Sequence, residues 1–122
     1  MRSFLTMLLA CSMFTVSATA TDAAVYGALA TTSTYPAIVY GYSADAATLG
    51  RAEAIALAGC RVHTRFACFV RVWFVGAGMC GAVARLGAHQ GWGYARGIVA
   101  ARLVALRAAG GGLIVATACN GI

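Results

Sequence analysis

The stretch from Tyr26 to Tyr42, YGALATTSTYPAIVYGY, decides the fold because a shorter version of it returns later in the chain. Residues 80–94 read CGAVARLGAHQGWGY. Gly27 and Gly81 of the two copies lie 54 positions apart, and Gly41 and Gly93 lie 52 positions apart. Two copies are too few for a solenoid, which needs about three. The repetition therefore predicts a duplicated unit, about 25–75 and 79–120, whose halves share one core.

Each copy predicts the same order of elements, β-β-α-β. Short runs of apolar and aromatic residues bounded by turn residues are typical of strands, and alanine-rich runs favour helix. The first copy is expected to form strands at Val25–Ala30 and Ala37–Tyr42, a helix at Leu49–Ala58 and a strand at Phe66–Val75. Thr48 is the expected N-cap of that helix. The last run is apolar enough for a central strand, with Arg71 as the exception.

The second copy begins with a strand at Cys80, and Gly91–Tyr94 is expected to be its second strand. In the following helix, Val99, Leu103 and Leu106 form an apolar stripe at helical spacing. Gly110–Gly112 are expected to end that helix because glycine readily takes a left-handed conformation, and LIVATAC then reads as the last strand. The predicted fold class is α+β, an antiparallel sheet packed with two helices and stapled by disulfides.

The first 20 residues have the plan of a secretory signal peptide. Arg2 precedes an apolar core that ends in the small residues Ala18-Thr19-Ala20, which predicts cleavage after Ala20. One alternative is a buried first element. Another is a lipoprotein, because LLAC resembles a lipobox in which Cys11 would carry the lipid and anchor the chain. The expected single domain then spans residues 21–122, in the cell envelope or outside the cell.

Composition limits the classes of function. Hydrophobic residues make up 61% of the chain, but no stretch after residue 20 has the roughly 20 uninterrupted apolar residues of a membrane span. Without Arg2, eight arginines stand against Asp22, Asp45 and Glu53, a net charge of +5. Such a charge favours anionic partners, for example an envelope polymer, while nucleic acid is not an expected partner of an exported protein.

Four cysteines remain after cleavage: Cys60, Cys68, Cys80 and Cys119. An even number in a small exported domain predicts two disulfides. Three pairings are open, and the preferred one joins Cys60 to Cys68 and Cys80 to Cys119. A zinc site is the alternative, but the cysteine spacings and the isolated His63 and His89 do not match the usual paired ligands.

The order of these motifs resembles the small secreted bacterial domain-of-unknown-function family 4189. That resemblance rests on YGALA, a Thr-started helix closing with Cys60, the CxVxxxF element of Cys68–Phe74, Cys80-Gly81-Ala82 and the terminal Cys119-Asn120. It covers about residues 25–120. It implies an exported, disulfide-bonded α+β module and no activity.

No catalytic constellation emerges from the residues. His63 and His89 have no catalytic neighbours in sequence, and the carboxylates are too few for a paired-acid site. Asp45 is expected to cap a helix or face its dipole, and Glu53 to lie on a helix surface. GAGMCG at 76–81 has GxGxxG spacing but leads into a strand, so it predicts a hairpin turn. We therefore expect no catalytic residues, cofactor or metal.

The remaining candidate is a binding surface. Trp92 and Tyr94, with the neighbouring His89 and Gln90, are expected to form a face for glycan or peptide. The expected function is that of a non-enzymatic binding module for an envelope polymer or a protein partner. A small secreted enzyme or an enzyme inhibitor is the alternative.

Overall fold

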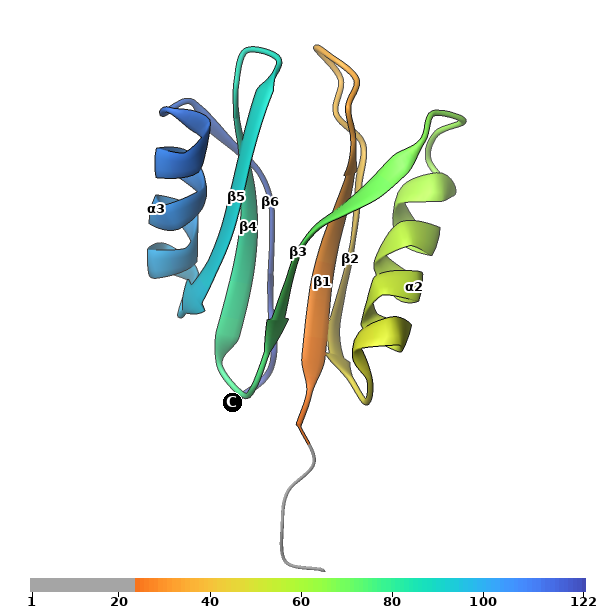
Figure 1. Ribbon diagram of the computed structural model, residues 1–122, viewed down its shortest axis with the longest axis vertical. Coiled ribbons are helices and arrows are strands. Elements are labelled where there is room, and N and C mark those ends of the chain that lie inside the picture. The colour runs from red at the N-terminus through yellow and green to blue at the C-terminus, as the bar shows by residue number, and fades with distance from the viewer. Residues whose placement is uncertain (1–23) are drawn as a thin grey trace, which may run out of the picture.

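The computed structural model describes residues 24–122, and within this range the chain forms four layers. Figure 1 shows these layers side by side, from α3 at the left through the two three-stranded sheets to α2 at the right. Both sheets are antiparallel, with strand orders β2-β1-β3 and β5-β4-β6. The predicted α+β class is confirmed. The expected single sheet is two sheets, because each repeat closes its own hydrogen-bonding ladder.

The first unit follows the predicted β-β-α-β order. Its elements are β1 (Tyr26–Thr32), β2 (Tyr40–Ala46), α2 (Leu49–Arg61) and β3 (Cys68–Val75). The second strand begins later than expected, because residues 37–39, which follow the bend at Tyr35-Pro36, lie in the loop before it. The Thr32 hydroxyl accepts from the backbone N–H of Val39 there. Placing Phe66–Val75 as a central strand was wrong, since β3 lies at an edge of its sheet.

The second unit repeats this order with β4 (Met79–Leu86), β5 (His89–Arg96), α3 (Ile98–Ala109) and β6 (Leu113–Cys119). Gly110, with φ 87°, ends α3 in the left-handed conformation that the three glycines predict. The GAGMCG segment does form a turn, with Gly76 and Gly78 at positive φ. It connects β3 to β4 across the two sheets, however, and the two strands belong to different ladders, so the expected hairpin pairing was wrong.

The two sheets pack face to face around one apolar cluster. Its buried members are Leu29, Val72, Phe74, Val83, Ala116 and Ala118. A Cβ on Gly27 or on Gly81 would collide with the Phe74 ring, so the glycines that open the two repeats leave room for one shared aromatic side chain. Between the sheets β3 lies near β5 and β2 lies near β6, so equivalent strands of the two units make equivalent contacts.

Each helix packs on the outer face of its sheet through alanines. Ala101, Ala105 and Ala109 are the buried residues of α3. The predicted apolar stripe was therefore wrong: Val99 is 67% exposed and Leu103 48% exposed. The reason lies on the strand, where a Cβ at Gly91 or Gly93 would collide with the helix. That close approach admits only an alanine face.

Both preferred disulfides are present. Cys60–Cys68 joins α2 to β3, and Cys80–Cys119 joins directly opposite residues of β4 and β6. The first helix is one turn longer than expected, so Cys60 lies inside it. Thr48 is confirmed as the N-cap, since its hydroxyl accepts from the backbone N–H of Arg51.

Asp45 does not have the expected capping role. It lies within β2 at φ 56°, and its carboxylate accepts from the backbone N–H of Gly121. Asn120 completes this contact, because its Oδ1 accepts from the Asp45 N–H while its Nδ2 donates to the carbonyls of Val25 and Gly76. Asn120, at the end of the second unit, is thus hydrogen-bonded to residues at both ends of the first unit.

Within residues 24–122 no helix has the length and apolarity to cross a membrane. The predicted signal peptide and the lipobox cysteine, Cys11, lie outside the described residues.

Candidate binding cleft

The strand β5 presents two aromatic side chains toward the neighbouring sheet. Trp92 and Tyr94 lie opposite Val83 and Gly81 of β4, and these two positions face the space between the sheets. The alternating Gly91 and Gly93 face α3. Trp92 is 40% exposed and Tyr94 58% exposed, because β5 is an edge strand and nothing in the described residues covers its rim.

A cleft of about 440 Å³ opens between the edges of β3 and β5. Trp92 and Tyr94 line it from the second unit, and Arg71 and Trp73 from the first. The more deeply placed residues are apolar: Val72, Phe74 and Met79. The cleft therefore combines an apolar floor with an aromatic wall and one cation.

Arg71 enters the cleft because of a bulge in β3. Leu29 pairs with Val72 and Ala30 pairs with Val70, which leaves Arg71 as an extra residue. Its guanidinium lies 5.1 Å from the ring centre of Phe69 and 5.2 Å from that of Trp92, within cation–π range of both. The charge is thus held between one ring from each unit.

Hydrogen bonds fix the orientation of this guanidinium. Arg71 Nε donates to Thr31 Oγ1 at 2.9 Å, and Nη2 donates to Ser33 Oγ at 2.8 Å. The Thr31 hydroxyl donates in turn to Gln90 Oε1, and Gln90 Nε2 donates to the carbonyl of Thr32, both at 2.7 Å. A polar chain therefore joins β3, β1 and β5 behind the aromatic rings.

A second hollow, of about 270 Å³, lies on the other side of the same Arg–Trp pair. Ser33, His89 and Gln90 line it together with Arg71 and Trp92. Both hollows share Arg71 and Trp92 and lie along β5, so they are adjoining parts of one groove. We call this groove the β3–β5 cleft, with Arg71 and Trp92 at its centre.

Arg71 is a cation in the cleft that has no acidic neighbour there. Burial lowers the pKa of the Arg71 guanidinium, because taking the charged form out of water disfavours it. No carboxylate lines either hollow. The guanidinium nevertheless stays charged at neutral pH, since arginine does not lose its proton in proteins.

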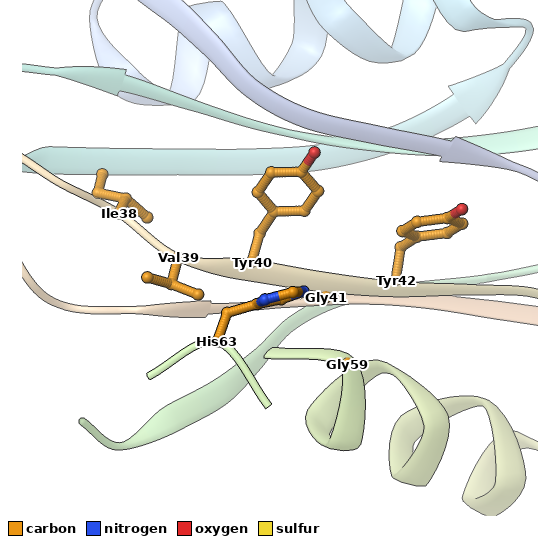
Figure 2. A pocket seen from close by; sticks show the side chains of 7 residues that line it. All are labelled: Ile38, Val39, Tyr40, Gly41, Tyr42, Gly59 and His63. Atoms are coloured by element: carbon orange, nitrogen blue, oxygen red, sulfur yellow. The ribbon is translucent and has the colours of Figure 1, made fainter. Parts of the chain in front are cut away.

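The opposite edge of the molecule carries the matching feature of the first unit. By strand register Tyr42 occupies the place of Trp92 and Tyr40 that of Gln90, so Gly41 corresponds to Gly91 rather than to Gly93. Val115 is the extra residue of the equivalent bulge in β6. A pocket of about 380 Å³ along β2 includes both tyrosines and His63. Figure 2 shows the tyrosine rings directed away from Gly59 and α2, with His63 on the helix side. The aromatic pair of this edge is displaced by two residues along the strand relative to that of β5, and its bulge carries no cation.

The four predicted binding residues, His89, Gln90, Trp92 and Tyr94, lie together on β5. Sequence reasoning missed Arg71, Phe69, Thr31 and Ser33, which come from the first unit. The available signal was the single charged residue in the apolar run CFVRVWFV.

The residues considered for catalysis occupy separate places. His63 lines the pocket along β2 and His89 the hollow beside Ser33, while Asp45 is bound to Gly121 and Glu53 lies on α2. Within residues 24–122 no three His, Cys, Asp or Glu side chains gather as a metal site would require. No family model, curated protein or solved structure matches the chain.

Proposed function

We propose that this protein is an exported, non-enzymatic binding module of the cell envelope, and that the β3–β5 cleft is its ligand site. The observation that carries the proposal is the Arg71 guanidinium held between Phe69 and Trp92 at the centre of an open groove. Aromatic and arginine side chains that are fixed in position, with an apolar floor and few polar groups, are typical of binding sites.

Export is the second part of the proposal. Two disulfides in a small domain fit an oxidising compartment. The pattern of residues 1–20 and the resemblance to family 4189 support the same location. Cleavage after Ala20 gives a free protein, whereas lipidation of Cys11 gives an anchored one. The N-terminal mass of the exported protein distinguishes these two forms.

The binding test uses the exported protein with its disulfides intact, immobilised and exposed to bacterial wall and membrane fractions. Wild type is expected to retain material from one of the fractions, and Trp92→Ala is expected to lose about tenfold or more of that retention, because the central ring of the groove is gone. The matched control is Tyr42→Ala, which removes the equivalent ring from the opposite edge. Equal retention by wild type and Trp92→Ala, or no retention from any fraction, would overturn the proposal.

A further inference from the structure

The β3–β5 cleft also indicates the chemistry of its ligand. Arg71 has five N–H donors, and the two hydrogen bonds to Thr31 and Ser33 engage Nε and one N–H of Nη2. Both N–H groups of Nη1 and the second of Nη2 have no hydrogen-bond acceptor among residues 24–122. An oriented guanidinium with free donors matches a carboxylate or phosphate, which accepts two parallel hydrogen bonds.

Charge complementarity supports an anionic group. The two carboxylate side chains within residues 24–122 lie elsewhere: Asp45 is in β2, where it accepts from the Gly121 N–H, and Glu53 is on α2. Partial burial takes the charged guanidinium of Arg71 out of water and so lowers its pKa. A ligand anion beside Nη1 would offset this effect, because an opposite charge favours the charged form.

The remainder of the ligand meets flat aromatic and hydroxyl surfaces. The face of an aromatic ring is negative, so it attracts the polarised C–H bonds of a sugar ring. Trp92 and Tyr94 lie two residues apart on one strand, about 7 Å from each other along it. Ser33 and Gln90 supply polar contacts on the far side of Trp92. A chain of rings that carry hydroxyl and acidic groups fits both hollows and the Arg–Trp pair between them.

Resting on the proposed binding function, we propose that the ligand of the β3–β5 cleft is an acidic polysaccharide, lying along β5 with an anionic group on Arg71 and a sugar ring on Trp92. The anion is the carboxylate of a uronic acid or the phosphate of a phosphorylated glycan. The shared chemistry is a sugar chain with regularly spaced negative charge.

The internal repeat supplies the matched variant. Val115 occupies the bulge of β6 that corresponds to Arg71 in β3, so this backbone position already accommodates valine in the second unit. Arg71→Val therefore removes the charge and introduces the residue type that the equivalent bulge of β6 already contains. Arg71→Lys keeps the positive charge but removes the planar fork. Equal urea midpoints for wild type and both variants establish that each is folded.

The experiment measures binding of four probes to the purified protein by calorimetry: oligogalacturonate, its methyl ester, a phosphorylated oligosaccharide and oligoglutamate of similar length. We expect at least one acidic glycan to bind about tenfold or more tightly than the methyl ester and the peptide. That preference is expected to weaken with added salt, to be intermediate in Arg71→Lys and to disappear in Arg71→Val. The two acidic glycans distinguish carboxylate from phosphate as the anion.

The outcomes separate the two proposals. If envelope material is retained through Trp92 but oligoglutamate binds as tightly as the acidic glycans, the ligand is an acidic peptide and this inference is overturned. Equal binding of acidic and esterified glycan, or unchanged binding by Arg71→Val, also overturns it while leaving the binding function in place. If retention does not depend on Trp92, the proposed function itself fails.

Discussion

At the scale of single residues, Arg71 and Asn120 each contact the other unit, although their neighbours in sequence do not predict it. Arg71 interrupts an apolar strand, yet the bulge turns it toward Trp92 of the other unit. Asn120 is 3% exposed and bonds to three backbone groups: one in β2, one at Val25 just before β1, and one in the turn after β3. Arg71 reaches the other unit through a cation–π contact, and Asn120 does so through hydrogen bonds.

Asn120→Ala is expected to lower the free energy of unfolding by about 2–3 kcal/mol, because it leaves the Asp45 N–H and two carbonyls without their partner. The shift in the urea midpoint measures this effect. The control is Thr64→Ala, which also removes a side-chain hydrogen bond, but one at an exposed turn. A similar small loss in both variants would show that Asn120 does not fasten the units.

At the scale of elements, the aromatic-Gly-aromatic triplet defines what an edge strand does. In both units the glycine lets a helix approach the strand, and the flanking rings face the space between the sheets. The helix face that packs on the strand is consequently limited to small residues, alanine in α3 and alanine with Cys60 in α2, which bury little apolar area per residue. The gain is a pair of exposed rings on a rigid strand, and rigid support keeps a binding surface in place.

Gly41→Ala is expected to destabilise the protein by about 1–3 kcal/mol or more, because its Cβ would collide with the backbone of Ala56 and Cys60 in α2. Gly50→Ala, which has nothing within 4 Å of the added Cβ, is the control in the same helix–strand pair. It is expected to gain about 0.5–1 kcal/mol from higher helix propensity. Urea unfolding of both variants would contradict this account if Gly41→Ala were neutral.

At the scale of the whole molecule, the duplication creates two edges of the same geometry and different chemistry. One edge joins β3 and β5 and carries Arg71, Trp92 and Tyr94. The other joins β2 and β6 and carries Val115, Tyr40 and Tyr42. Each edge takes strands from both units, so neither exists in an isolated half.

The two disulfides are expected to contribute unequally to the stability of the whole molecule. Cys60–Cys68 spans 8 positions and Cys80–Cys119 spans 39, so loop-closure entropy assigns them about 2.5 and about 4 kcal/mol. Thermal unfolding of the two double-alanine variants checks this order. A larger loss from the Cys60/Cys68 variant would mean that native-state contacts, rather than loop length, determine the contributions.

The sequence by itself determined the order of elements, the duplication, the Thr48 cap and the helix end at Gly110, because each depends on local conformational preference or on periodicity. It also favoured the disulfide pairs that the structure contains. It identified the residues that β5 contributes to the cleft, but not those of the first unit. The cap, the helix end and the element order are readable because neighbouring residues specify them, while the cysteine pairing was a preference among three that the structure then resolved.

Only the tertiary structure decided which faces are buried and what Arg71 contacts. The alanine face of α3 replaces the expected Val99–Leu103–Leu106 stripe because glycines on a strand outside the helix set the packing distance. The split into two sheets, the bulges at Arg71 and Val115 and the Asp45–Asn120 contact depend on pairing between distant segments. The candidate site belongs to this second group, since its cation and its central ring come from different units and meet only when the sheets pack.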